Sequence, residues 1–305
     1  MRFIILSVVW SIVLFSCAGK TEQVKAKYVF YFIGDGMGVN QVIGTEMYLA
    51  ELEGRIGTKS LSFTSFPVRN YVTTYSGTNA VTCSAAAGTA LATGTKTQNG
   101  RIGMRQDSSF LYSIAWRAKQ AGKAVGVTTS VAINHATPAV FYAHQPDRQM
   151  YYEIGTDAAK AGFDFYGGAG WKQVFSPHDS SEIDLYSLLR DSGYVIIDHR
   201  RDFLALSTGA GKVVYVQPED CVNPSSLPAA IDRKEGDLTL ADITRKAIQF
   251  LSARNEDGFF LMWKVALLTG FATQMTVRLL FGKLLIFQKL FRSPLIFTRL
   301  TRMKH

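Results

Sequence analysis

Acidic residues are absent from the last stretch of this 305-residue chain, because none follows Asp257. Residues 263–305 hold eight Lys or Arg, which leaves 25 basic and 24 acidic residues in the first 262. The net charge of +9 is therefore a property of the tail, and the body of the protein is nearly neutral. A neutral body lacks the broad basic surface that binds a phosphate backbone, so we expect no nucleic-acid partner.

Long apolar runs are also scarce at the N-terminus. The first run is too short to span a bilayer comfortably, and it follows one positive charge and ends in small residues, which is the pattern of an export signal over residues 1–17. Residues 14–17 (LFSC) resemble a bacterial lipoprotein box, so we expect Cys17 to be lipidated and to anchor the protein in a membrane. Cleavage near Ala18 is the alternative.

Export places the mature protein outside the cytoplasm. A lipidated protein would reside in the periplasm or on the outer membrane, and a protein cleaved in the ordinary way would be secreted. Of the three cysteines, Cys83 and Cys221 then remain, and their spacing does not decide whether they form a disulfide.

Short apolar runs alternate with helical patterns over residues 27–262. The run YVFYFI ends in Gly-Asp-Gly, which is typical of a buried parallel strand with a loop at its carboxyl end. Strands are expected at residues 28–33, 124–130, 163–168, 194–197, 213–216 and 258–262. Helices are expected at residues 41–52, 85–92, 182–189 and, from the capping box Thr239-Leu-Ala-Asp242, to about 253. The alternation predicts an α/β domain: a three-layer sandwich with a mostly parallel central sheet and helices on both faces.

Two candidate catalytic residues stand where open α/β sheets bind ligands, beyond the carboxyl ends of strands. Asp35 lies in GDGMG directly after the first strand, and a simple turn aspartate is the alternative. Ser84 opens a helical run; it is either an ordinary N-cap or a nucleophile whose target phosphate is held by the helix N-terminus. Cys83 is not the nucleophile of a cysteine phosphatase, because the required Arg six residues later is Thr89 here.

A second group follows the strand at residues 124–130. Strand-like alternation would point the side chains of His135 and Thr137 in one direction. Arg148 comes eleven residues after Thr137, and its planar guanidinium suits two phosphate oxygens. A lone histidine or arginine is usually structural, but four such elements in this order indicate a phosphate site.

The segments GDGMG, VTCSAAAGTALATG, NHATPAVFYAH and DLTLADIT make residues 27–262 resemble the alkaline phosphatase family. The resemblance implies a hydrolase of small phosphate monoesters in which Ser84 becomes a phosphoserine and Arg148 clamps the phosphate. It implies a homodimer and, as cofactors, two Zn²⁺ and one Mg²⁺. Asp35 would bridge one zinc and the magnesium, and Ser84 would ligate that zinc. His135 and Thr137 would belong to the magnesium site.

The chain departs from the family at two places. Cys83 stands where many members carry Asp, so a carboxylate that would orient Arg148 is lost. After FFLM, members continue with a segment like VEGGxIDWxCHAND, which supplies the magnesium-site Glu and the Asp and His of the first zinc site. The corresponding residues are Lys264, Thr269 and Thr273, and none of them replaces a zinc ligand.

A one-base frameshift accounts for the second departure. When WKVALLTGFATQMT is back-translated and read one base earlier, the permitted codons include the family segment in register. We therefore interpret residues 263–305 as an aberrant, out-of-frame tail and the domain as incomplete at its C-terminal end. A chain without the first zinc site and the magnesium-site Glu is expected to have little turnover and to fold poorly.

Several alternatives remain open. The tail can be a genuine basic, Leu/Phe-rich membrane segment, although its charges do not share one helical face and Pro294 interrupts it. The enzyme can be a sulfatase or phosphodiesterase of the same superfamily. The chain can also be a non-catalytic phosphate- or metal-binding lipoprotein. Its oligomeric state is open too, because the truncation can remove part of a dimer interface.

Overall fold

The computed structural model describes residues 26–217, 225–228 and 232–266. The export signal with Cys17, the second cysteine Cys221 and residues 267–305 of the tail lie outside the described residues. The described strands form one six-stranded sheet in the order β1-β6-β2-β3-β5-β4, and every pairing in it is parallel. The predicted α/β class with a mostly parallel sheet is confirmed.

The elements follow the alternation expected from the sequence. The strands are β1 (Tyr28–Gly34), β2 (Ala124–Thr129), β3 (Phe165–Gly167), β4 (Tyr194–Ile197), β5 (Lys212–Tyr215) and β6 (Phe259–Val265). The helices are α2 (Val39–Glu51), α3 (Ser84–Thr93), α4 (Ile114–Gln120), α5 (Ala136–Ala139), α6 (Tyr151–Ala161), α7 (Leu185–Asp191), α8 (Arg200–Ala205) and α9 (Leu240–Arg254), with a 3-10 turn at Phe63–Ser65. The capping box that opens α9 is present: Thr239 Oγ1 accepts from the Asp242 N–H, and the Asp242 carboxylate accepts from the Thr239 N–H.

Strand β6 is longer than expected. It was expected to end at Met262, but it continues to Val265, since Trp263, Lys264 and Val265 keep their pairing with β1. All seven residues of β6 are buried, because β1 and β2 flank the strand. The structure thus places the first residues of the basic tail inside the sheet.

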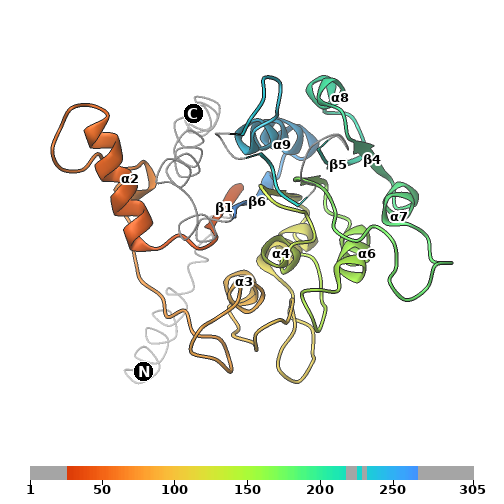
Figure 1. Ribbon diagram of the computed structural model, residues 1–305. Coiled ribbons are helices and arrows are strands. Elements are labelled where there is room, and N and C mark those ends of the chain that lie inside the picture. Colours follow the sequence, from red (N-terminus) through yellow and green to blue (C-terminus); the bar gives the residue numbers. More distant parts are fainter. Residues whose placement is uncertain (1–25, 218–224, 229–231, 267–305) are drawn as a thin grey trace, which may run out of the picture.

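Helices cover both faces of the sheet, as the layer architecture requires (Figure 1). One apolar cluster joins β2, β3 and β6 to α3, α5, α6 and α7, and a second joins the other face to α8 and α9. Alternation along β6 divides its side chains between these clusters: Phe260 and Met262 face the first, and Phe259 and Leu261 face the second. Each cluster is continuous, so the described part of the domain has a core on either side of the sheet.

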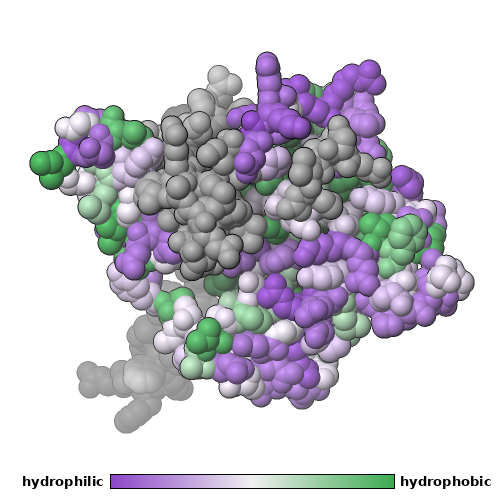
Figure 2. Space-filling model, in the orientation of Figure 1, coloured by the Kyte–Doolittle hydropathy of each residue, from purple (hydrophilic) through white to green (hydrophobic). Residues whose placement is uncertain are grey.

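Helix α2 stands away from the sheet and exposes apolar side chains (Figures 1 and 2). Val39, Ile43 and Met47 are each about half exposed or more. In the part of the chain that the structure describes, no helix has both the length and the apolar character to cross a membrane.

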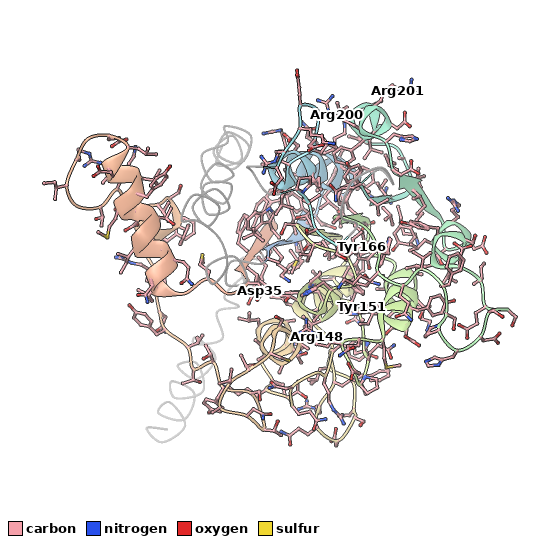
Figure 3. The ribbon with its side chains drawn as sticks, in the orientation of Figure 1. Asp35, Arg148, Tyr151, Tyr166, Arg200 and Arg201 are labelled. Atoms are coloured by element: carbon pink, nitrogen blue, oxygen red, sulfur yellow. The ribbon has the colours of Figure 1, made fainter. Side chains whose placement is uncertain are left out.

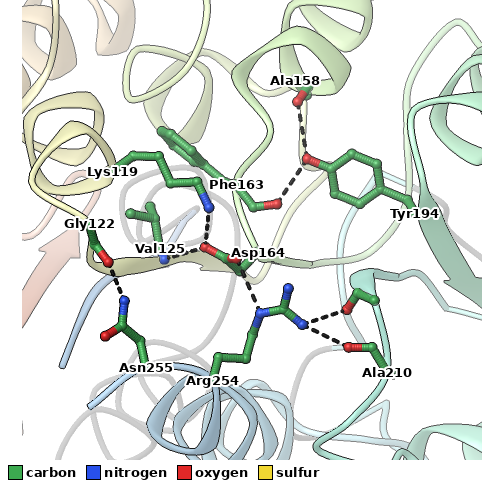
Figure 4. A network of polar contacts seen from close by, with 11 residues as sticks. Lys119, Gly122, Val125, Ala158, Phe163, Asp164, Tyr194, Ala210, Arg254 and Asn255 are labelled. Carbon is green, nitrogen blue, oxygen red and sulfur yellow. Dashed lines mark hydrogen bonds and ion pairs between the residues drawn. The ribbon is translucent and has the colours of Figure 1, made fainter. Parts of the chain in front are cut away.

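The buried carboxylate of Asp164 joins several elements near the start of β3 (Figure 4). Asp164 is 8% exposed, and its carboxylate lies 2.7 Å from Lys119 Nζ and 3.2 Å from Arg254 Nε. It also accepts a hydrogen bond from the Val125 N–H at 2.8 Å. These three contacts join α4, α9 and β2 around the start of β3, so Asp164 supports the scaffold.

Candidate active site

Asp35 lies one residue beyond β1, on the face of the sheet that carries α3 and α5. Within β1, Val29, Tyr31 and Ile33 face that side, and Asp35 continues the same alternation. Its backbone N–H donates to the Val265 carbonyl at 2.9 Å, which extends the β1–β6 pairing past the end of β1. Gly36 then turns the chain with φ of 77°, a conformation that favours glycine. The strand therefore holds the Asp35 carboxylate in a defined place.

Ser84 directs its hydroxyl at Asp35. The N-cap of α3 is Cys83, which makes no side-chain cap, and Ser84 is the first residue of the helix. Its Oγ donates to Asp35, 3.3 Å from Oδ2 and 3.5 Å from Oδ1. The ordinary N-cap alternative is wrong for this serine, because its hydroxyl bonds a carboxylate from another element.

Thr137 and His135 reach the site through a short helix. His135 is the N-cap of α5 and Thr137 lies within it, so strand-like alternation, which we expected, is not what aligns them: β2 already ends at Thr129. Thr137 is buried, and its Oγ1 donates to Asp35 Oδ2 at 3.3 Å. Helix α5 packs closely on α3, where a Cβ at Gly88 would lie 3.1 Å from Val140 Cγ2. This close approach brings Thr137 and Ser84 to the same carboxylate.

Lys264 completes a cluster of polar side chains with Asp35, Ser84, His135 and Thr137. It is fully buried in β6, and its Nζ lies 3.0 Å from Asp35 Oδ2 and donates to His135 Nδ1 at 3.1 Å. The position follows from register, because Lys264 pairs with Ile33 on β1 and with Thr129 on β2. The ammonium therefore stands between the carboxylate and the imidazole.

The charges in the cluster depend on one another. Burial acts to raise the pKa of Asp35, but the charge and hydrogen bond of Lys264, together with His135 and Thr137, bring it below its ordinary value. Burial lowers the pKa of Lys264 to about 8, with Asp35 acting in the opposite direction. Burial, together with the charges of Lys264 and Arg148, lowers the pKa of His135 to about 3, although the charge of Asp35 acts in the opposite direction. At neutral pH the carboxylate is charged and the imidazole is neutral.

Arg148 lies at the opposite side of His135 from Lys264. Its NH2 is 3.5 Å from His135 Nε2, and its charge acts on the thiol of Cys83, the residue before Ser84. Arg148 and Asp35 lie beside α3 in the view of Figure 3. The Cys83 Sγ accepts a hydrogen bond from the Gly100 N–H at 3.1 Å.

Comparison with known proteins shows which family this chain is similar to. Residues 26–167 match the family model described as Alkaline phosphatase, and this segment contains Asp35, Ser84, His135, Thr137 and Arg148. The chain belongs to the alkaline phosphatase family. Alkaline phosphatase 3 of Bacillus subtilis is 32% identical over 251 residues, which are 80% of this chain and 51% of that protein. This chain thus spans about half the length of that relative.

Solved alkaline phosphatases share the fold. The cold-active enzyme of Shewanella sp. superposes with a TM-score of 0.76 at 27% identity, over 90% of this chain and 65% of the other. A variant of the enzyme of the Antarctic bacterium TAB5, which has magnesium bound in its M3 site, gives a TM-score of 0.74 at 25% identity, over 90% and 74%. The three-layer arrangement around the site is therefore that of the alkaline phosphatase fold.

The structure brings most of the predicted alkaline phosphatase site together. Asp35, Ser84 and Thr137 share hydrogen bonds, and Arg148 contacts His135. Lys264 was missed as a member of the site, because it was assigned to an out-of-frame tail. The sequence held a signal for it: a lysine two residues after Met262 keeps the alternation of a buried strand and faces the same side.

The donor set fits a divalent metal ion poorly. Among the residues that the structure describes, no three His, Cys, Asp or Glu side chains gather at one point. The two strongest donors of the cluster, Asp35 Oδ2 and His135 Nδ1, both face the Lys264 ammonium. An ammonium ion in that place competes with a metal cation for the same lone pairs.

Proposed function

We propose that this protein is a phosphate monoester hydrolase of the alkaline phosphatase type with impaired turnover. The observation that carries the proposal is the contact of Ser84 Oγ with Asp35 at 3.3 Å, at the N-terminus of α3 and within the segment that matches the family. A serine placed there can attack a phosphorus atom whose oxygens face the free N–H groups of the helix.

Ser84 acts as the nucleophile. Its Oγ forms a bond to phosphorus as the bond to the ester oxygen breaks, and the alcohol leaves with a proton, so the product is a phosphoserine. Water then attacks the same phosphorus and releases inorganic phosphate and the free serine. Asp35 accepts the Ser84 hydrogen bond and orients Oγ, and Arg148 holds the negative charge of the phosphate.

The metal cofactors of the family, Zn²⁺ and Mg²⁺, supply Lewis-acid stabilisation when they are bound. In this chain Asp35, Ser84, His135 and Thr137 would be their ligands, but the Lys264 ammonium beside Asp35 does not fit that set. A metal ion contributes several kcal/mol to such a reaction, so we expect turnover roughly a thousandfold or more below that of an intact homologue.

The test is hydrolysis of p-nitrophenyl phosphate by the full chain and by Ser84→Ala, with Ser207→Ala at an exposed turn as the control. Slow hydrolysis that disappears in Ser84→Ala, with phosphate on the Ser84 peptide after acid quenching, supports the proposal. Hydrolysis that survives Ser84→Ala, or faster hydrolysis of sulfate esters or diesters than of monoesters, refutes it. Phosphate binding without any turnover would favour a non-catalytic binding protein instead.

Other parts of the proposal concern the N-terminal segment, the assembly of the protein and the origin of its basic tail. We propose export by the segment at residues 1–17, anchoring through a lipidated Cys17, and a homodimer as in the family. A frameshift origin of residues 263–305 is tested by resequencing the codons for Phe260 to Thr276. An additional base that restores VEGG would assign a full-length phosphatase, and an unchanged reading would establish Lys264 as native.

A further inference from the structure

Lys264 has the surroundings of a bound cation. Lysine is almost never fully buried unless its ammonium is paired, and Lys264 is 0% exposed. Alternation along β6 puts it on the face of Phe260 and Met262, under α3 and α5. Its strand is also central in the sheet, with β1 paired on one side and β2 on the other.

The ammonium contacts the groups that a metal ion would need. Its Nζ lies 3.0 Å from a carboxylate oxygen of Asp35 and 3.1 Å from the imidazole nitrogen Nδ1 of His135. The same Asp35 oxygen accepts hydrogen bonds from Thr137 and from Ser84. Carboxylate oxygen, imidazole nitrogen and hydroxyl oxygen are ligands of Zn²⁺ and Mg²⁺, which bind them at about 2.0–2.2 Å. A divalent ion that binds Asp35 Oδ2 and His135 Nδ1 together would have to displace Nζ from between them.

We propose that Lys264 is a built-in cation that replaces a divalent metal ion at the cluster of Asp35, His135 and Thr137. The cluster then binds neither Mg²⁺ nor Zn²⁺ while Lys264 is present. The lysine neutralises Asp35 and keeps the carboxylate turned toward Ser84, but it supplies one positive charge where a metal supplies two. The inference rests on the proposed function only in that it treats the cluster as a site of the alkaline phosphatase type.

The replacement also explains why the cluster can persist without a metal. A partly buried carboxylate without a counter-charge is costly, and an ammonium at 3.0 Å supplies that charge. Because Lys264 belongs to the strand that pairs with β1, the counter-charge is delivered by folding of the sheet itself. A dissociable ion is not needed to hold Asp35 in place.

The experiment measures metal binding to the full chain by equilibrium dialysis against Mg²⁺ alone and Zn²⁺ alone, followed by elemental analysis. The variants are Lys264→Glu, which adds a carboxylate where the ammonium lies, and Lys160→Glu, which makes the same charge change at a largely exposed side chain. We expect Lys264→Glu to bind Mg²⁺ or Zn²⁺ roughly tenfold or more tightly than wild type, and Lys160→Glu to match wild type. A folded Lys264→Glu protein with no gain overturns the proposal.

A second arm covers the case in which Lys264→Glu does not fold. Wild type and Asp35→Ala are dialysed in the same way, and their thermal midpoints are compared with and without each metal. The proposal requires that Asp35→Ala bind as much metal as wild type. It also requires that neither metal raise the thermal midpoint of wild type more than that of Asp35→Ala. Stoichiometric Mg²⁺ or Zn²⁺ in wild type that is lost in Asp35→Ala overturns it.

Metal binding is measured without turnover, so the two proposals fail separately. A chain that hydrolyses no ester can still gain metal in Lys264→Glu, which would leave the built-in cation intact. Slow hydrolysis that depends on Ser84 and also on a metal bound by Asp35 would support the proposed function. It would refute the proposal that Lys264 replaces the metal.

Discussion

Asp35 directly follows the first described strand and Lys264 lies in the last, yet their charged atoms meet at 3.0 Å. The contact exists because β1 and β6 are neighbouring parallel strands with Ile33 opposite Lys264. Both side chains lie on the face that carries α3 and α5, where Ser84 and Thr137 contact the same carboxylate. The pairing of β1 with β6 therefore fixes the position of the carboxylate that the candidate catalytic serine contacts.

The pair should matter for stability as well as for metal exclusion. Lys264→Met removes the partner of a mostly buried carboxylate, so we expect the free energy of unfolding to fall by about 3 kcal/mol. Urea denaturation measures the change. The double variant Lys264→Met/Asp35→Asn should recover part of the loss, because it leaves no unpaired charge. A double variant no more stable than Lys264→Met would contradict this account.

The Asp164 network should be a second stabilising centre, independent of the active site. Asp164→Asn weakens its contacts with Lys119 and Arg254, and we expect a loss of about 2 kcal/mol in the free energy of unfolding. Asp198→Asn is a matched control, because that carboxylate is 54% exposed and should change stability by less than about 0.5 kcal/mol. Equal effects of the two substitutions on the urea midpoint would count against a structural role for the network.

Helices α3 and α5 should tolerate little added volume at their contact. Gly88→Val adds methyl groups where a Cβ would already lie 3.1 Å from Val140 Cγ2, so we expect a loss of about 1–3 kcal/mol. Ala87→Val, one residue earlier in α3, is the control and should cost only about 0.5 kcal/mol from helix propensity. Combining Gly88→Val with Val140→Ala should restore stability in thermal unfolding. If it does not, crowding against Val140 is not the cause.

The capping box of α9 should make stability depend on acid pH. Burial acts to raise the pKa of Asp242, but hydrogen bonds from Thr239 and Arg245 bring it below its ordinary value of 3.8. Because the pKa is lower in the folded state, the carboxylate stabilises the protein above the unfolded-state pKa, and this contribution is lost as the pH falls through the folded-state pKa. The stability difference between wild type and Asp242→Asn should therefore be constant near neutral pH and shrink below about pH 4. A difference that stays constant into strong acid would argue against the carboxylate as its source.

Local patterns in the sequence sufficed for most of the scaffold. Continuous apolar runs such as residues 194–197 predict buried parallel strands, and that strand ends where it was expected. The Thr239–Asp242 box places the start of α9 because capping involves only residues within one turn. Asp35 and Ser84 were recognisable because they stand at a strand end and at a helix start. Thr137 and Arg148 were recognisable from the single segment, residues 134–148, that holds them both. Features of this kind depend only on residues that are close together in the sequence.

Only the tertiary structure decided what those side chains contact. Whether Ser84 caps its own helix or reaches Asp35 depends on how α3 packs against β1, and no pattern within VTCSAAAG contains that information. Thr137 is aligned by α5 and its close contact with α3, not by alternation along β2. The place of Lys264 depends on the order of the sheet, which inserts the last described strand between the first two. Long-range pairing of this kind is set by the packing of the whole sheet, and it turned a residue of an apparently foreign tail into the counter-charge of the candidate active site.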